Sequence, residues 1–254
     1  MENIIEINNL TFKYNNKNTL FEKLNVDIEK GKITTLLGKN GCGKSTLIKI
    51  LAKNLNYNSG SIKLEGKELN SYSLKELASI LAIVYQKNET PREISVYDMV
   101  SFARLPYQNI FFYKPNASDV EKIEFALEKT SLQAYKDKRV DELSGGQLQR
   151  VYIAMALAQS TDIIILDEPT TFLDIKYQKS IMQLVRDLNK SLGITIIMVL
   201  HDINQALAYS DNIIALLDGK VIKNDQAANF FDENLLNKLY DADIKIEDGK
   251  VISW

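Results

Sequence analysis

The sequence predicts an α/β fold that combines an antiparallel β-lobe, a central and mostly parallel sheet, and a helical subdomain inserted into that core. Three observations lead to this prediction. Short runs of alternating apolar and polar residues occupy the start of the chain. Unbroken apolar runs recur later, and an amphipathic stretch over about residues 87–160 has helical spacing. The 254 residues fit one compact domain, since neither a tandem repeat nor a linker rich in Gly, Pro or Ser divides them.

The β-lobe is predicted from three alternating runs near the start of the chain. They cover Ile4–Leu10, Leu20–Ile28 and Ser61–Glu65, and the last run leads into a turn at Gly66 and Lys67. Alternation places apolar side chains on one face of a strand and polar side chains on the other. Antiparallel strands with one buried face have this pattern.

The central sheet is predicted from four short apolar runs that lack alternation, namely Ile33–Leu37, Ile163–Leu166, Ile194–Val199 and Ile213–Leu217. Strands buried on both faces of a parallel sheet have this composition. Between the second and third runs, apolar residues recur at helical spacing from Ile181 to Leu192, and Gly193 stands where a glycine commonly ends a helix. These segments therefore predict a strand–helix–strand crossover.

The remaining segments are predicted to be helical or peripheral. Val120, Ile123 and Leu127 follow a helical repeat within the inserted subdomain, which extends from about Lys87 to Ser160. The tail after Gly219 has the pattern of a hairpin and a helix. The sequence gives this tail no specific role in function.

Composition limits the function. A formal net charge of −2 argues against a nucleic-acid partner, because proteins that bind nucleic acids concentrate positive charge. Cys42 is the only cysteine, and the first residues lack the pattern of a secretory signal, so we expect a reducing, cytosolic compartment. The longest apolar runs fall well short of the roughly 18–20 residues that span a bilayer. A role at the membrane would therefore need a partner.

A phosphate-binding loop is predicted directly after the run Ile33–Leu37. The next nine residues read GKNGCGKST and match the P-loop pattern G-x-x-x-x-G-K-[ST] in its strand-to-helix context. Lys44 is expected to reach the β- and γ-phosphates of ATP, and Ser45 to ligate Mg²⁺. Backbone N–H groups of the loop would surround the phosphates. The expected nucleotide contacts here are Gly38, Asn40, Gly41, Cys42, Gly43, Lys44, Ser45 and Thr46.

Two alternatives apply to this loop. The segment could be a glycine-rich turn that contains a lysine by chance. Cys42 has neither a histidine nor a second cysteine beside it in the sequence, so we expect a loop residue that contributes its backbone N–H rather than a nucleophile or a metal ligand.

A pair of carboxylates follows the apolar run Ile163–Leu166. Ligands bind at the carboxyl ends of the strands in open parallel sheets, so Asp167 and Glu168 are expected to face the nucleotide. Asp167 suits a role at Mg²⁺. Glu168 would hold the attacking water as the general base. The alternative is an exposed turn at the end of a strand, closed by Pro169.

A second candidate anion site is the sequence LSGGQ, which begins at Leu143. A capping serine and two glycines can open a helix whose N-terminus approaches an anion closely. This segment resembles the signature of ATP-binding-cassette (ABC) proteins, and the P-loop earlier in the sequence fits the same family. The resemblance implies that two such subunits pair head to tail as a homodimer, and that the signature of one contacts the γ-phosphate bound by the other. The residues concerned would be Ser144, Gly145, Gly146 and Gln147. Taken alone, the segment could be an ordinary capped helix.

Four further positions match ABC proteins one by one. Tyr14 would stack on adenine, although a tyrosine of the β-lobe core is the alternative. Gln86 resembles the glutamine that senses Mg²⁺, and otherwise would be a surface residue. Asp174 resembles an aspartate that acts across the dimer interface, and otherwise caps a helix. His201, the only histidine, resembles the residue that contacts the γ-phosphate, and otherwise would be structural.

Three stretches resemble the ATP-binding subunits of importers for iron complexes, a group that includes siderophores, haem and cobalamin. They are Asp98–Gln108, Val151–Gln159 and the stretch from Thr170 to Ile175. Leu148 departs from the family, in which arginine is frequent there. Lys176 and Tyr177 occupy a place where the group often has histidine.

The resemblance implies a function and its partners. Two copies would bind Mg-ATP, close, and move two transmembrane permease subunits served indirectly by a substrate-binding protein. Hydrolysis would reopen the pair. The subunit would lie at the cytoplasmic face of the membrane, attached through the permease. Phe111, Phe112 and Tyr113 would either receive the permease or pack within the helical subdomain. Other cargo, such as zinc, manganese or an amino acid, and a soluble ABC-type ATPase without a permease are the alternatives.

Overall fold

A computed structural model describes residues 2–14, 18–86, 88, 91–107, 115–230, 232–247 and 250–253. The chain divides into two compact units, each described by itself below. The first unit combines Met1–Tyr72 with Thr195–Trp254, and the second consists of Ser73–Ile194. Within the described residues, no helix combines the length and the apolar character that a bilayer crossing needs.

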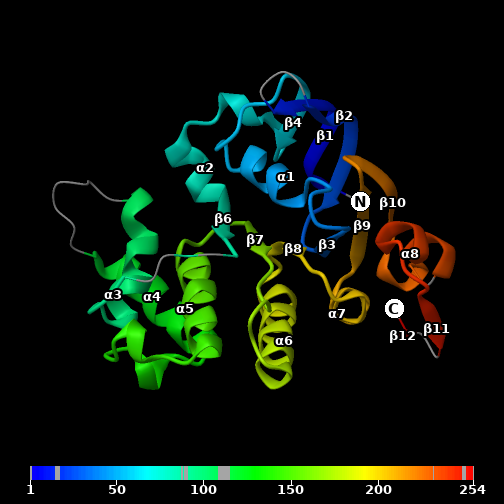
Figure 1. The fold of residues 1–254 in the computed structure, drawn as a ribbon. Coiled ribbons are helices and arrows are strands. Elements are labelled where there is room, and N and C mark those ends of the chain that lie inside the picture. The colour runs from blue at the N-terminus through cyan, green and yellow to red at the C-terminus, as the bar shows by residue number, and fades with distance from the viewer. Residues whose placement is uncertain are drawn as a thin grey trace. The chain divides into compact units, whose positions relative to one another are not determined.

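The first unit contains the predicted β-lobe, an antiparallel sheet in the order β2-β1-β4-β5 (Figure 1). Its strands are β1 (Asn3–Tyr14), β2 (Asn18–Glu29), β4 (Ser59–Leu64) and β5 (Lys67–Glu68). Ile7 of the central strand pairs with Val26 on one side and Ile62 on the other, and all three side chains are buried. The alternation read from the sequence therefore corresponds to one buried face.

The same unit contains parallel strands. β3 (Ile33–Leu37) lies between β8 (Thr195–Val199) and β9 (Asn212–Leu217), parallel to both. Every residue of β3 and β8 is buried, as the unbroken apolar runs predict. β9 continues through a two-residue turn at Asp218 and Gly219 into antiparallel β10 (Lys220–Gln226). The carboxyl end of β3 leads into the P-loop and α1 (Lys44–Leu51).

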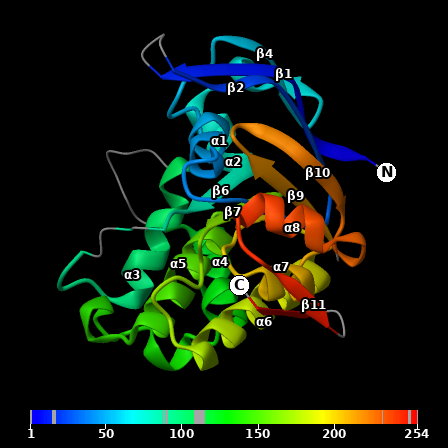
Figure 2. The ribbon, with the colours of Figure 1, turned by 45° about the vertical axis from the view of Figure 1, so that its right-hand side comes forward.

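The C-terminal part of the first unit packs on a small core of its own. Its elements are α7 (Ile203–Tyr209), a 3₁₀ turn (Ala227–Asn229), α8 (Glu233–Tyr240), β11 (Lys245–Glu247) and β12 (Lys250–Ser253). Ile203, Leu236, Ile244 and Val251 form the buried cluster, and Figure 2 shows α7, α8 and β11 gathered together. After Gly219 the chain forms β10, which pairs back onto β9, then helix α8 and the antiparallel pair β11–β12, in agreement with the predicted hairpin and helix.

The second unit contains two parallel strands and most of the helices. Its elements are α2 (Leu74–Ile80), β6 (Leu81–Val84), α3 (Val96–Ser101), α4 (Ala117–Lys129), α5 (Gly145–Ala158), β7 (Ile163–Asp167), α6 (Ile175–Leu192) and 3₁₀ helices at Phe102–Tyr107, Gln133–Tyr135 and Val140–Glu142. A further 3₁₀ helix, Leu69–Ser71, belongs to the first unit. β6 pairs with β7 in parallel, Ile83 opposite Ile165. Gly193, in the left-handed conformation, ends α6 as predicted.

Helices α3, α4 and α5 pack together in this unit, as both views show (Figures 1 and 2). A buried ion pair links the 3₁₀ helix Phe102–Tyr107 to α4, because the Arg104 guanidinium lies 2.8 Å from the Asp119 carboxylate. Arg104 also donates to the carbonyls of Ala158 and Gln159 at the end of α5. Arg104 belongs to the stretch Asp98–Gln108 that resembles iron-complex importers. In this chain its side chain joins α4 and α5, so Arg104 has a structural role here. Gln108 and the segment Phe111-Phe112-Tyr113 lie outside the described residues.

Candidate functional site

The P-loop of the first unit follows a path that only glycine can take at its beginning. Gly38 has φ 152°, and a Cβ added there would lie 2.2 Å from the carbonyl oxygen of Leu216 in β9. It would also lie 2.7 Å from the Cys42 sulfur. The loop therefore passes against the end of β9 without room for a side chain.

Gly43 ends the loop and begins helix α1. Its backbone is left-handed, with φ 114°, and a Cβ would lie 2.6 Å from the ring of the fully buried Phe21. As the N-cap, it supplies no side-chain hydrogen bond to the first turn of α1. Backbone N–H groups at such a helix start carry partial positive charge and can bind an anion.

The Lys44 side chain folds back onto its own loop. Its ammonium donates to the carbonyl oxygens of Gly38 (2.6 Å) and Lys39 (3.0 Å) and lies 3.8 Å from the Cys42 sulfur. The residue is only 5% exposed. The Cys42 backbone N–H, predicted to face the phosphates, donates here to the Lys39 carbonyl at 3.3 Å. The Lys44 ammonium thus lies among the backbone carbonyl groups of its own loop.

Three more predicted residues belong to this unit. The Tyr14 hydroxyl lies 2.8 Å from Thr46 Oγ1, and its ring packs edge-to-face with the ring of Phe12, with the two ring centroids 4.8 Å apart. Tyr14 is 43% exposed, so it is not a core residue of the β-lobe. His201 is exposed and follows β8, whose parallel neighbour β3 leads into the P-loop. Tyr14, through its hydroxyl contact, is therefore tied directly to α1.

The C-terminal helix α8 also contacts the P-loop, which the sequence did not predict. Asp241 at its end lies 3.5 Å from Lys39 of the loop. Burial raises the pKa of the Tyr240 hydroxyl, with smaller contributions from the nearby charges of Cys42 and Asp202. An acid and an aromatic residue about 200 positions after the loop carried no sequence signal for this contact.

The second unit carries the predicted carboxylates. Asp167 ends β7 and is 7% exposed. Glu168 follows with a left-handed backbone, φ 54°, which is uncommon for a residue with a side chain. Its carboxylate accepts hydrogen bonds from the Gln86 amide and from Thr171 Oγ1 (3.0 Å). Two predicted site residues, Gln86 and Glu168, are thus in direct contact, because parallel β6 and β7 end at the same edge.

The LSGGQ segment opens helix α5 as a reciprocal cap. Ser144 Oγ accepts from the Gln147 backbone N–H at 3.4 Å, and Gln147 Oε1 accepts from the Ser144 backbone N–H at 3.0 Å. A Cβ at Gly146 would lie 2.4 Å from the ring of Tyr177, so packing within the unit requires that glycine. The position of Gly145 has a different character. A Cβ there would only touch Leu173 at an ordinary 3.5 Å.

The turn before α6 presents the predicted Asp174. Its carboxylate caps α6 by accepting from the Tyr177 backbone N–H at 3.0 Å, which is the structural role weighed for it as an alternative. Phe172 is 87% exposed and has a left-handed backbone, and Ile175 is 84% exposed. Two large apolar side chains in water beside a predicted interface residue are unusual for a surface without a partner.

The fold and these features match a large family. A family model described as ABC transporter matches residues 21–171. The chain is 44% identical to an iron(3+)-hydroxamate import ATP-binding protein of Bacillus subtilis, over 89% of this chain and 84% of that protein. It is 40% identical to a petrobactin import ATP-binding protein of the same organism, over 96% and 95%. It is 38% identical to a ferric enterobactin transport ATP-binding protein of Escherichia coli, over 95% and 89%.

Solved structures agree with this match. cbiO1 of Clostridium perfringens, part of an ABC transporter complex, has a TM-score of 0.83 at 33% identity, covering 94% of each chain. An inward-facing putative metal-chelate type ABC transporter also has a TM-score of 0.83, at 30% identity over 99% of this chain and 96% of that one. The fold and the site thus define an ABC-type ATPase. The chain belongs to the ABC transporter family and is one of its ATP-binding subunits.

Proposed function

We propose that this chain powers the import of a ferric siderophore or a related iron complex. The observation that carries the proposal is the extent of the matches, because relatives named for three different iron complexes each match about nine-tenths of the chain or more. The ATP-binding subunit does not hold the cargo, so its own site residues support the energy source rather than the choice of complex.

We infer that residues of both units act on ATP. The first unit would hold the phosphates with the P-loop and Lys44, stack adenine on Tyr14 and approach the γ-phosphate with His201. From the second unit, Glu168 would act as general base and Gln86 would position it. The hydrogen bond that the Gln86 amide donates to the Glu168 carboxylate supports that pairing. The signature, Ser144 to Gln147, and Asp174 would act on the nucleotide of a second copy.

Mg²⁺ would accompany ATP, held by Ser45, Asp167 and Gln86. Among the described residues, no group of three or more His, Cys, Asp or Glu side chains could hold a metal. Mg²⁺ commonly takes one or two protein ligands together with phosphate oxygens and water. The buried carboxylate of Asp167 and the exposed Ser45 at the start of α1 are oxygen donors of the required kind. When bound, the ion would neutralise charge on the phosphates.

A homodimer of this chain would complete two such sites and move two membrane permease subunits at the cytoplasmic face. The exposed Phe172 and Ile175 beside Asp174 support the homodimer, because burial of two such side chains would favour association by a few kcal/mol. A substrate-binding protein would deliver cargo to the permease and not to this chain. Co-purification of a polytopic membrane protein with the tagged chain tests this arrangement, and its absence would favour an ATPase that works without a permease.

The mechanistic assignment is tested with Glu168→Gln. Loss of a general base lowers turnover by roughly 10²–10⁴-fold. ATP binding should persist, and the variant should accumulate as an ATP-bound dimer in size-exclusion chromatography. Near-normal hydrolysis by this variant would remove Glu168 from the role of base.

The cargo is tested by deletion of the coding sequence in its host. Growth and ⁵⁵Fe uptake should fail with ferric hydroxamate or catecholate siderophores as the iron source, and a plasmid copy should restore them while the Glu168→Gln copy should not. Haem, cobalamin, zinc and manganese serve as parallel supplies. A defect confined to one of those four would reassign the cargo and leave the ATPase assignment intact.

A further inference from the structure

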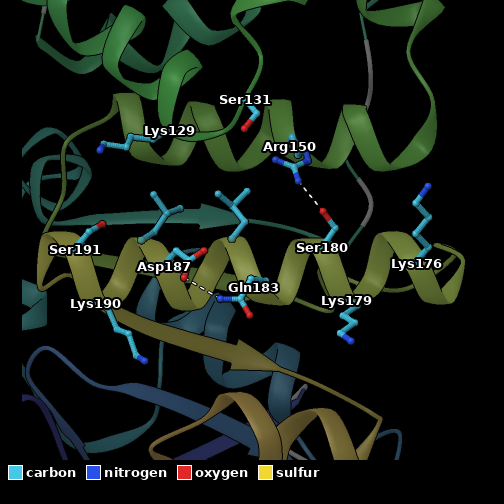
Figure 3. Close-up of a pocket in the computed structure, with 12 residues that line it drawn as sticks. Lys129, Ser131, Arg150, Lys176, Lys179, Ser180, Gln183, Asp187, Lys190 and Ser191 are labelled. Carbon is cyan, nitrogen blue, oxygen red and sulfur yellow. Dashed lines mark hydrogen bonds between the residues drawn. The ribbon is translucent and has the colours of Figure 1, made fainter.

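A groove of about 860 Å³ lies in the second unit, outside every residue assigned to the nucleotide. One wall consists of the end of α4, the following Ser131 and helix α5, and the other wall is helix α6 (Figure 3). Leu184 and Leu188, both buried, line its base. The volume is in the range of sites for small molecules.

Positive charge dominates this groove. Its five cationic side chains are Lys129, Arg150, Lys176, Lys179 and Lys190, and Asp187 is its one acidic side chain. The chain as a whole has a formal charge of −2, so the groove is positively charged on a protein that is slightly negative overall. Among the described residues, Lys176, Lys179 and Lys190 form no ion pair.

The centre of the groove is fixed by hydrogen bonds. The guanidinium of Arg150, which is half-buried, donates to the Thr130 carbonyl at 2.8 Å and to Ser180 Oγ at 2.7 Å. Figure 3 shows the second of these bonds crossing from α5 to α6. An anion near Ser180 would therefore meet a guanidinium that is already oriented, with little loss of side-chain freedom.

The one acid does not neutralise the lysines. Asp187 Oδ1 accepts a hydrogen bond from Gln183 Nε2 at 2.8 Å, on the same helix. Lys129, from the other wall, lies 5.4 Å from the ring of Phe125. Ser131 and Ser180 add hydroxyl donors between the cations. The groove thus offers several donors and positive charges and only one carboxylate.

We propose that this groove binds a small, soluble oligophosphate anion. Guanidinium, ammonium and hydroxyl donors together suit the several oxygens and charges of such a ligand better than those of a monovalent ion. A ligand of this kind would contact α5 and α6 at once. These helices begin at the signature and at Asp174, so occupancy would tie together the two elements predicted to meet a second copy.

The test measures binding of inorganic tripolyphosphate by isothermal titration calorimetry at low salt. Because the P-loop is also predicted to bind phosphates, every protein in the titrations carries Lys44→Ala. The groove variant is Lys129→Glu with Lys176→Glu. The matched control is Lys75→Glu with Lys238→Glu, which makes the same charge change at exposed positions outside the groove.

The groove variant should bind tripolyphosphate at least about tenfold more weakly than the parent, because two attractive charges become repulsive. The control should bind like the parent, and both variants should keep the parent's circular dichroism and melting temperature. Absence of binding in the parent, or equal loss in groove and control variants, would overturn the proposal. Binding only to vesicles that contain phosphatidylglycerol would also overturn it, in favour of a membrane contact. The readout needs no hydrolysis, so it is independent of the proposed transport function.

Discussion

The P-loop and the signature are both glycine-containing segments that open a helix, but the chain holds them differently. In the first unit, Gly38 and Gly43 have no space for a Cβ, and Lys44 is buried among the loop carbonyls. In the second unit, the position of Gly145 would accept a Cβ at an ordinary contact distance. The chain's own packing therefore explains Gly38 and Gly43 of the P-loop and leaves Gly145 unexplained. A residue that the fold does not require is a candidate for contact with something outside the chain.

The largest effect on folding is expected at the interior of the second unit. Asp119→Ala should lower the free energy of unfolding by about 3–5 kcal/mol, because it leaves Arg104 charged and buried without its counterion. Denaturant unfolding followed by circular dichroism measures it. Asp141→Ala removes an exposed ion pair with Arg139 in the same unit and serves as the control. Equal losses in the two variants would contradict the central role given to the buried pair.

A smaller but still large effect is expected at the P-loop. Gly43→Ala should lower the free energy of unfolding by about 3 kcal/mol, since the Cβ meets Phe21 and the left-handed backbone is strained. ATP binding should be lost with it. Gly66 also has a left-handed backbone, but a Cβ there would meet no neighbouring atom. Gly66→Ala should therefore lower the free energy of unfolding by only about 1–2 kcal/mol. Equal losses of unfolding free energy in Gly43→Ala and Gly66→Ala would mean that the contact with Phe21 does not contribute to the effect.

Two substitutions of Tyr14 distinguish its contribution to stability from its contribution to ATP binding. Tyr14→Phe removes the hydroxyl contact with Thr46 and should cost about 1 kcal/mol of stability while ATP affinity is kept. Tyr14→Ala should in addition weaken ATP binding by about tenfold, because a stacked ring is worth roughly 1–3 kcal/mol. Equal ATP affinity in Phe and Ala variants, measured with a fluorescent nucleotide, would rule out stacking.

The smallest change in stability is expected at Gly145, and it should have the opposite sign. Gly145→Ala should leave the free energy of unfolding unchanged or raise it by up to about 1 kcal/mol, since alanine favours a helix. The ATPase rate should nevertheless fall by about 100-fold, because a methyl group displaces a closely approaching nucleotide. Full activity in this variant would mean that Gly145 is no nearer to a nucleotide than any surface residue.

The sequence predicted most of the fold because its signals are local. Unbroken apolar runs identified β3, β7, β8 and β9, and Gly193 marked the end of α6. Helix α2 was missed although Ser73 and Glu76 form the reciprocal cap that its sequence allows, since seven residues are too short for a clear repeat. The predicted subdomain over residues 87–160 remains a prediction, whereas the compact unit runs from Ser73 to Ile194.

What the sequence could not predict depends on contacts between distant residues. The ion pair of Arg104 and Asp119 and the approach of Asp241 to the P-loop join side chains whose spacing follows no repeat. The groove collects cations from α4, α5 and α6 in the same way. Motifs indicated the individual site residues, whose roles remain predictions, and the contact between Gln86 and Glu168 required the pairing of β6 with β7.

Phe172 and Ile175 have a consequence for how the subunit behaves over time. A chain that keeps two large apolar side chains in water is expected to self-associate as its concentration rises, so the rate per chain should fall on dilution. Copies made in excess of their membrane partner would also be prone to precipitate or to be degraded. Balanced synthesis of the two components would then matter as much to a cell as the chemistry of the site.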